Sequence, residues 1–359
     1  MPLSCGDVVT VDTVLHADLI DCPDNGLVIG ADGVRIDLNG HRISGDSALN
    51  EQCVPDDVCD VGIVNSAGYD GTVVENGLLR DFALGVLVIG ASDNRLSHVR
   101  VSRSLFSGVV VVEASRTRIQ HSTVTANGLT TDQAGIAVFA SRGTRIDYDV
   151  VSGNGDIGLF AVEGTDSSRI AHSVFSDNFE AGVILEGSGN RVVKNRFRRN
   201  GDGLVVTGDG NVIRANHVTD TLGCGGECGN AISFEGGSNN LVEGNLIERT
   251  FWGIRLDAFT GLALDTVVRS NHVRDASMDG IVVDLNQAGP VTGTLLDRNR
   301  VTRSGDDGID VNAEDTTLMR NVANHNRDLG IEAVPGVTDG GNNRAAGNGN
   351  PLQCTGVSC

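Results

Sequence analysis

The chain has 359 residues, of which 48 are glycine and only 4% are aromatic, and its formal net charge is -20. This acidic balance lacks the basic footprint that nucleic-acid binding requires, so we expect no nucleic-acid partner. No apolar run approaches the roughly 18 residues of a membrane-spanning helix, so we expect no membrane partner. Short runs rich in Val and Ile, broken by Gly, Asn, Asp and Ser, favour an all-β fold.

One phrase, a glycine followed by an aliphatic residue, recurs roughly every 21 to 28 residues, which is the pattern of a stacked repeat. It predicts a single-domain parallel β-helix, or solenoid, of roughly a dozen coils. We assign 1–25 to an N-terminal cap, 26–334 to the coils and 335–359 to a C-terminal cap or tail. The repeat begins at Gly62, Gly85, Gly108, Gly135, Gly158, Gly182, Gly203, Ala231, Gly253, Gly280, Gly308 and Gly330.

The eight cysteines fall into four couples that are close in sequence. Local disulfides are the simplest pairing, because distant coils of a solenoid cannot bring two cysteines within bridging distance. Disulfides indicate an oxidising compartment, and hence a secreted or periplasmic protein. A zinc site is the rival interpretation. No signal peptide is visible, and residues 1–4 are typical of a mature start placed after an initiator Met. The couples are Cys5/Cys22, Cys53/Cys59, Cys224/Cys228 and Cys354/Cys359.

Polar residues recur where the coils turn. Six asparagines occupy one such turn and should form hydrogen bonds from coil to coil. Three histidines, His98, His121 and His172, precede the same corner in earlier coils, and we interpret them as surface residues rather than metal ligands. The asparagines are Asn195, Asn216, Asn245, Asn271, Asn299 and Asn321.

The chain resembles the pectin-lyase-like superfamily of right-handed parallel β-helices. Residues 37–45, with the sequence DLNGHRISG, resemble the opening of many secreted bacterial β-helix repeat proteins, and residues 347–359 resemble their tail. The resemblance implies a right-handed helix. It does not choose a function, because the superfamily includes lyases, hydrolases, epimerases, fructotransferases and binding proteins.

Each coil begins at the repeat glycine or alanine, which we count as its first residue. Alternation along the recurring strand then places the third and fifth residues on the outer face. In the C-terminal half this face becomes charged. Glu235, Asp257 and Asp284 should stack as a ladder of carboxylates, which a raised pKa, Arg255 or a bound cation must offset. The catalytic candidates are therefore Glu235, Arg255, Asp257 and Asp284.

Long loops surround the same strands, at 221–229, 259–264 and 286–293, and loops on both sides of a strand build a groove. Trp252, the only tryptophan, falls inside this patch, and its indole suits stacking on a sugar. The candidate substrate-binding residues are Trp252, Asn230, Ser233, Asp310 and Asn312.

A second acid/base set follows from a partial motif. Asp306 and Asp307, in the segment SGDDGI, resemble the paired aspartates of polygalacturonase-type glycosidases, and Asp279 lies where that family has a further aspartate. The Gly-His-Gly and Arg-Ile-Lys segments of that family have no counterpart here. The resemblance therefore implies acid/base roles for Asp279, Asp306 and Asp307 without specificity for uronic acids.

The N-terminal half of the same outer face is apolar. An exposed stripe of this size is typical of a subunit contact, so we expect a homo-oligomer, such as a trimer, rather than coverage by the tail of the chain. The stripe comprises Leu87, Ile89, Val110, Val112, Phe139, Phe160 and Val162.

These patterns favour a carbohydrate-active enzyme that cleaves or transfers glycosidic bonds and has a polysaccharide or oligosaccharide as substrate. This hypothesis requires no cofactor. The first alternative is a calcium-assisted polysaccharide lyase or epimerase, in which Arg255 acts as base or carboxylate partner and the acidic residues hold Ca²⁺. The second alternative is a solenoid that binds sugar or metal without catalysis.

Overall fold

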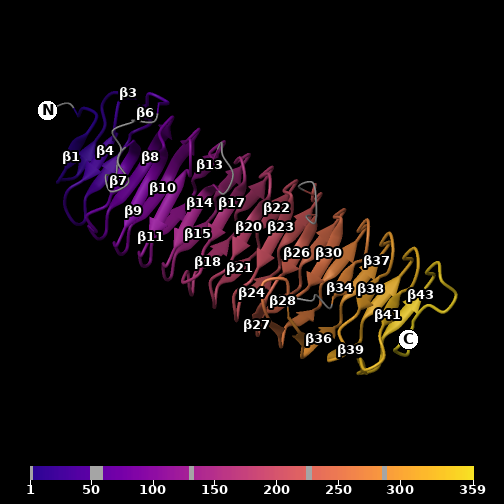
Figure 1. Ribbon diagram of the computed structural model, residues 1–359. Coiled ribbons are helices and arrows are strands. Elements are labelled where there is room, and N and C mark those ends of the chain that lie inside the picture. The colour runs from indigo at the N-terminus through magenta and orange to yellow at the C-terminus, as the bar shows by residue number, and fades with distance from the viewer. Residues whose placement is uncertain (1–2, 49–59, 129–132, 224–228, 285–288) are drawn as a thin grey trace. The chain divides into compact units, whose positions relative to one another are not determined.

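The computed structural model describes residues 3–48, 60–128, 133–223, 229–284 and 289–359, and these residues form strands but no α-helix. They divide into two compact units, Met1–Phe179 and Glu180–Cys359. Each unit is built from coils of short parallel strands (Figure 1), which confirms the predicted parallel β-helix. Among the residues described, no helix could cross a membrane.

In the first unit, the recurring Gly-aliphatic strands pair in chain order to form one parallel sheet. This sheet contains β1 (Asp7–Val9), β4 (Leu27–Ile29), β7 (Val61–Asn65), β9 (Leu84–Ile89), β11 (Val109–Val112), β14 (Ala134–Phe139) and β17 (Ile157–Ala161). The other faces of the coils are β2 (Thr13–Val14), β3 (Leu19–Cys22), β5 (Arg35–Asp37), β6 (Arg42–Gly45), β8 (Val73–Arg80), β10 (Arg95–Ser102), β12 (Arg118–Gln120), β13 (Thr123–Thr125), β15 (Arg145–Asp147), β16 (Val150–Ser152), β18 (Arg169–Ala171) and β19 (Val174–Ser176). The first coil, at 7–22, thus lies inside the segment assigned to the N-terminal cap.

The second unit repeats this arrangement. Its sheet of recurring strands contains β20 (Ala181–Leu185), β23 (Asp202–Val206), β26 (Asn230–Phe234), β30 (Trp252–Leu256), β34 (Ile281–Val283), β38 (Ile309–Val311) and β41 (Ile331–Ala333). The remaining faces are β21 (Arg191–Val193), β22 (Arg196–Arg198), β24 (Val212–Arg214), β25 (His217–Thr219), β28 (Leu241–Glu243), β29 (Leu246–Glu248), β32 (Val267–Arg269), β33 (His272–Arg274), β36 (Thr294–Asp297), β37 (Arg300–Thr302), β39 (Thr316–Met319), β40 (Val322–Asn324), β42 (Thr338–Asp339) and β43 (Arg344–Ala346).

The register of the recurring strands sets which side chains face the interior. Ile254 in β30 pairs with Ile232 in β26 and with Ile281 in β34, and all three side chains are fully buried. The residue two places further along each strand is also buried, as at Leu256. The core is therefore a stack of aliphatic side chains, and the residues between them point outward.

The asparagine corner is confirmed in the second unit. The side-chain oxygen of Asn245 accepts both the backbone N–H and the side-chain amide of Asn216, and its own amide donates to the Ile213 carbonyl. The same hydrogen bonds recur at Asn271, Asn299 and Asn321. Each buried amide thus satisfies the backbone of the coil beside it.

The histidine column of the first unit contains a tyrosine that the sequence interpretation omitted. His98, His121, Tyr148 and His172 stack with ring centroids 5.1, 5.1 and 4.8 Å apart. Tyr148 separates His121 from His172, so the three histidines do not form one continuous ligand set.

Two predicted disulfides are confirmed, Cys5–Cys22 and Cys354–Cys359, with Cα–Cα distances of 5.4 and 6.3 Å. The couples Cys53/Cys59 and Cys224/Cys228 lie outside the described residues.

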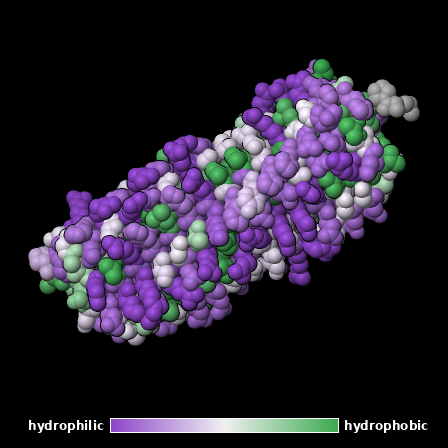
Figure 2. All heavy atoms as spheres, turned by 180° about the vertical axis from the view of Figure 1, so that it is seen from behind, coloured by the Kyte–Doolittle hydropathy of each residue, from purple (hydrophilic) through white to green (hydrophobic). Residues whose placement is uncertain are grey.

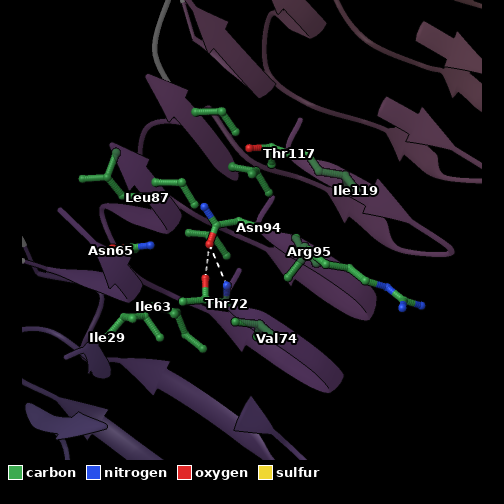
Figure 3. Close-up of a pocket in the computed structure, with 15 residues that line it drawn as sticks. Ile29, Ile63, Asn65, Thr72, Val74, Leu87, Asn94, Arg95, Thr117 and Ile119 are labelled. Atoms are coloured by element: carbon green, nitrogen blue, oxygen red, sulfur yellow. Dashed lines mark hydrogen bonds between the residues drawn. The ribbon is translucent and has the colours of Figure 1, made fainter. Parts of the chain in front are cut away.

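The first unit has a small cavity of about 20 Å³ between its aliphatic layers (Figure 3). The backbone N–H and hydroxyl of Thr72 both donate to the side-chain oxygen of Asn94 at its wall. A space of this size fits about one water molecule, so it does not fit a sugar.

Candidate functional site

The outer face of the second unit carries an ion-paired group centred on Arg255 in β30. Its guanidinium lies 3.2 Å from Asp257 Oδ2 and 3.8 Å from Asp284 Oδ2. Because Phe234, Leu256 and Val283 are in register, the residues that follow them, Glu235, Asp257 and Asp284, lie at equivalent places on three neighbouring coils. Arg255 therefore offsets part of the negative charge of the predicted ladder.

Asp257 is only 4% exposed, whereas Asp284 is half-buried. One oxygen of Asp257 accepts the backbone N–H of Phe259 at 3.2 Å and the other faces Arg255. Its carboxylate therefore holds the turn that follows β30. Asp284 is the more accessible of the two predicted catalytic aspartates.

Trp252 lies at the start of β30 and is half-buried. The Arg255 guanidinium is 5.3 Å from the centroid of its ring, and the Phe251 ring meets it edge-on with centroids 4.5 Å apart. One face of the indole thus interacts with a cation, which reduces the area that Trp252 itself offers to a sugar.

Two predicted substrate-binding residues are buried. Ser233 is in β26, and Asn230 at the start of that strand donates its backbone N–H to Asp202 at 2.7 Å. Burial raises the pKa of Asp202 to about 6, although its hydrogen bonds from Gly229 and Asn230 act in the opposite direction. Asp202 thus holds the backbone of Gly229 and Asn230 at the start of β26.

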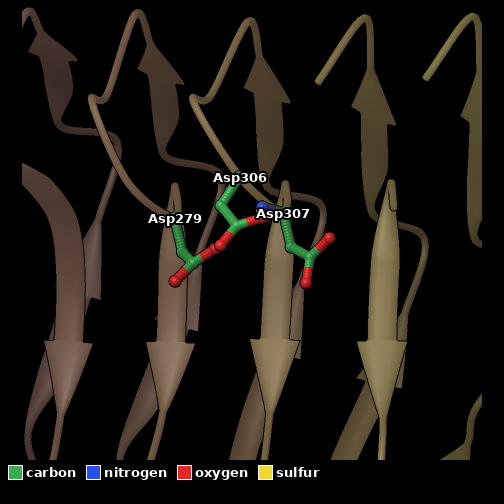
Figure 4. A group of neighbouring side chains, drawn as sticks. All are labelled: Asp279, Asp306 and Asp307. Carbon is green, nitrogen blue, oxygen red and sulfur yellow. Dashed lines mark hydrogen bonds between the residues drawn. The ribbon is translucent and has the colours of Figure 1, made fainter. Parts of the chain in front are cut away.

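An acidic cluster lies in the turns that lead into β34 and β38, one and two coils after the Arg255 strand (Figure 4). Carboxylate oxygens of Asp279, Asp306 and Asp307 lie within 4.8 Å of one another. The backbone N–H of Asp307 donates to Asp279 Oδ1 at 2.8 Å, and that of Leu329 donates to Asp307 Oδ1 at 2.6 Å. Asp279 and Asp307 thus also cap the turn of the coil that follows each of them.

Asp310 and Glu332 extend the cluster along the outer face, since Asp310 in β38 is in register with Glu332 in β41. The Asn312 side-chain amide donates to Asp310 Oδ2 at 2.9 Å. Asp310 is half-buried and Glu332 is exposed, so both are accessible to a ligand. Within the described residues, no lysine or arginine forms an ion pair with Asp279, Asp307 or Asp310.

Unpaired negative charge and burial raise the pKa values in this cluster. Burial, followed by the neighbouring acids Glu332 and Asp279, raises the pKa of Asp307 to about 8. Burial and the charge of Asp279 raise the pKa of Asp310 to about 6. Burial also raises the pKa of Asp279, with a contribution from Asp306. The cluster therefore contains carboxyl groups that carry a proton near neutral pH.

The residues that could hold a cation are Asp279, Asp306 and Asp307. Ca²⁺ takes about six to eight oxygen ligands. Because Asp279 and Asp307 each commit one oxygen to a backbone N–H, this set would need several water or substrate oxygens to complete such a shell. The cluster fits acid/base chemistry without that requirement.

A small sheet that the sequence did not reveal follows the strands of the outer face. The chain leaving β26, β30 and β34 forms β27 (Gly237–Ser238), β31 (Ala263–Leu264) and β35 (Val291–Thr292), which pair in parallel. The hydroxyl and backbone N–H of Thr260 both donate to the Glu235 carbonyl at 2.8 Å. Parts of the other predicted loops, 224–228 and 285–288, lie outside the described residues.

The apolar stripe in the first unit is less exposed than its sequence suggests. Leu87 is 6% exposed and packs with Val61 and Val64, so the expectation that Leu87 is exposed was wrong. Outward apolar side chains of neighbouring coils cover one another because the coils are closely spaced. Ile89, Val110, Val112, Phe160 and Val162 are half-buried, and Phe139 is 36% exposed. The oligomeric state stays a prediction.

Sequence reasoning omitted several residues of the site. Glu332 occupies an outward position but belongs to no motif, and Phe251 and Phe259 lie outside the alternating strand positions. Glu332 is the third residue of the repeat that begins at Gly330, so its outward position follows from the sequence, although no candidate motif includes it.

The chain matches the family described as "Right handed beta helix region" over residues 61–218 and 162–294, which together cover more than half of its length. The chain belongs to this family. No curated protein sequence matches it.

Solved structures share the fold. The periplasmic alginate epimerase AlgG, in a mutant form, is 13% identical with a TM-score of 0.60, covering 82% of this chain and 76% of that chain. DFA-IIIase from Arthrobacter chlorophenolicus, in complex with GF2, is 14% identical with a TM-score of 0.53, covering 76% of this chain and 67% of that chain. At these identities the likeness concerns the fold alone.

Proposed function

We propose that this protein is a secreted or periplasmic enzyme that hydrolyses or transfers glycosidic bonds. The observation that carries the proposal is the placement of half-buried Asp310 beside half-buried Asp284, at the border between the uncompensated acidic cluster and the Arg255 group. Two carboxyl groups in different environments are the minimum that glycosidic cleavage requires. The alginate epimerase and DFA-IIIase show that enzymes use this fold.

Asp310 serves as the general acid in this proposal. Its pKa of about 6 lets it carry a proton near neutral pH, and it is accessible enough to touch a substrate. Asp307 has a higher pKa but is only 5% exposed, so it presents little surface to a substrate. Asp284, paired with Arg255, serves as the ionised carboxylate.

The two side chains also have a suitable spacing. Asp310 pairs with Val282, and Asp284 lies two residues further along the same coil. With parallel strands about 4.8 Å apart and a rise of about 3.3 Å per residue, the Cα atoms of such diagonal neighbours are roughly 8 Å apart. Inverting glycosidases separate their carboxyl groups by about 6.5–9.5 Å, which leaves room for a water molecule. Asp284 would take a proton from that water as it attacks the sugar, while Asp310 gives its proton to the departing oxygen.

The substrate class follows from charge. The net charge is -20, and Arg255, the one cation at the outward strand positions, is already paired with two aspartates. A neutral polysaccharide or oligosaccharide therefore suits the site better than a polyuronate, which carries a negative charge on each sugar.

A calcium-assisted lyase or epimerase is the second candidate, and the close grouping of Asp279, Asp306 and Asp307 favours it. Arg255 would be the base or carboxylate partner there, but its two ion pairs oppose such a role. Incubation with neutral and uronic polysaccharides, with and without a chelator, separates the candidates. Products that gain one water per cleavage support hydrolysis, unsaturated products that absorb in the ultraviolet support elimination, and no product on any substrate supports a binding protein.

A further inference from the structure

Three large exposed hydrophobic side chains of the second unit flank β30 in the sequence, namely Phe251, Phe259 and Leu262. The other two in the described part of this unit are Leu222, which precedes β26, and Leu352, which lies in the C-terminal tail. Phe251 directly precedes β30 and is 41% exposed, whereas Phe259 follows it in the next turn and is 56% exposed. Exposed aromatic rings that flank a polar site are typical of ligand contacts rather than of a core.

The Phe251 ring is held in place without being covered. Its backbone N–H donates to the Gly229 carbonyl at 3.0 Å, and a side chain at Gly229 would come within 2.6 Å of Phe251 Cβ. The ring meets Trp252 edge-on at 4.5 Å, and Trp252 in turn carries the Arg255 guanidinium. These contacts connect Phe251 to the ion-paired group on the same strand.

The Phe259 end is fixed by the carboxylate of Asp257. Asp257 Oδ1 accepts the Phe259 N–H, and the next residue, Thr260, donates twice to the Glu235 carbonyl. Because Asp257 is only 4% exposed, its side chain can orient Arg255 and Phe259 but presents little surface to a ligand.

We propose that Phe251 and Phe259 are sugar-stacking positions at opposite ends of one track, with Asp257 as the positioning residue that connects them. The ligand is a neutral oligosaccharide that lies along β30, so this inference rests on the proposed function and deepens it. The apolar faces of pyranose and furanose rings match exposed phenyl rings, and the acidic groups between the rings match sugar hydroxyls. At about 3.3 Å per residue, the five-residue strand β30 alone spans roughly 16 Å, which is long enough for several sugar units.

The single tryptophan is a built-in reporter, since Trp252 contacts Phe251. Neutral gluco- and fructo-oligosaccharides of two to eight units are titrated into the full chain while its fluorescence is followed, with calorimetry as a second readout. We expect Phe251→Ala and Phe259→Ala each to weaken binding of the longest chains about three- to tenfold. Binding of disaccharides, which cannot reach both rings, should lose less. Phe251→Tyr and Phe259→Tyr keep a ring and should bind like the wild type.

Phe179→Ala is the matched control, because the Phe179 ring is 64% exposed but lies in the first unit. This variant should bind saccharides like the wild type. Asp257→Ala, which removes the acceptor of the Phe259 N–H, should weaken binding of long chains as Phe259→Ala does, with circular dichroism confirming intact coils. If the wild type neither binds nor cleaves any saccharide, the proposed function fails and this inference fails with it. If the wild type cleaves saccharides but Phe251→Ala, Phe259→Ala and the Asp257 variant all bind them as well as the wild type does, only this inference is overturned. Self-association that Phe251→Ala abolishes, without saccharide binding, would identify a protein interface and also overturn it.

Discussion

Asp149 occupies an asparagine-type corner position in the first unit and is 1% exposed. Its Oδ1 accepts the Ser122 N–H at 2.7 Å, as the asparagine oxygens of the second unit accept from the preceding coil. At the asparagine corners of the second unit, the side-chain amide donates to a backbone carbonyl. Asp149 has its Oδ2 in the place of that amide, and this oxygen is buried without a hydrogen-bond partner. Asp149→Asn should replace a buried acceptor with the donor that the position requires.

The magnitude follows from the pKa. Burial raises the pKa of Asp149 to about 7 from an ordinary value of 3.8. Between these values the folded state binds the proton more tightly than the unfolded state, so stability decreases as pH rises from about 4 to about 7 and is then constant. Each pH unit corresponds to about 1.4 kcal/mol, which gives a total of about 4 kcal/mol for this fully buried group.

Urea denaturation of the wild type and Asp149→Asn, followed by circular dichroism at pH 5 and pH 8, tests this reasoning. The variant should be more stable at pH 8, and its advantage should be about 3 kcal/mol larger there than at pH 5. Glu113→Gln, at an exposed acid of the same unit, controls for the loss of one charge. An advantage that is the same at both pH values, or a variant that is less stable at pH 8, would refute the assignment.

Three further predictions concern the site and the coils. Asp310→Asn should lower turnover about 100-fold or more without unfolding the chain, as measured by product analysis. Wild-type turnover should decline as pH rises through about 6, where Asp310 loses its proton, as measured by a pH profile. Asn245→Ala removes a buried acceptor and a donor, so it should cost about 2–4 kcal/mol in urea denaturation, whereas Asn350→Ala in the C-terminal tail should cost far less. Val110→Asp should convert an oligomer to monomer in light scattering, and a monomeric wild type would contradict the expected subunit contact.

The periodicity of the sequence was enough to predict the coils. A glycine followed by alternating aliphatic residues specifies which side chains face a narrow interior, because side-chain direction in a strand depends only on position. The regular asparagines at the corners and the local cysteine couples followed from the same repeat. At Asn245 and at Cys5–Cys22 the structure contains the contacts that the spacing indicated.

The site was only partly predictable. Alternation placed Asp257, Asp284 and Asp310 on one face, but it could not show that Asp257 is buried beneath Arg255 and a turn while Asp284 and Asp310 stay accessible. Nor could it show that burial and the neighbouring acids raise the pKa of Asp307, or that Phe251 and Phe259 flank the same strand. Burial, ion pairing and the paths of loops depend on residues from different coils. The distances between such residues are set only when the chain folds.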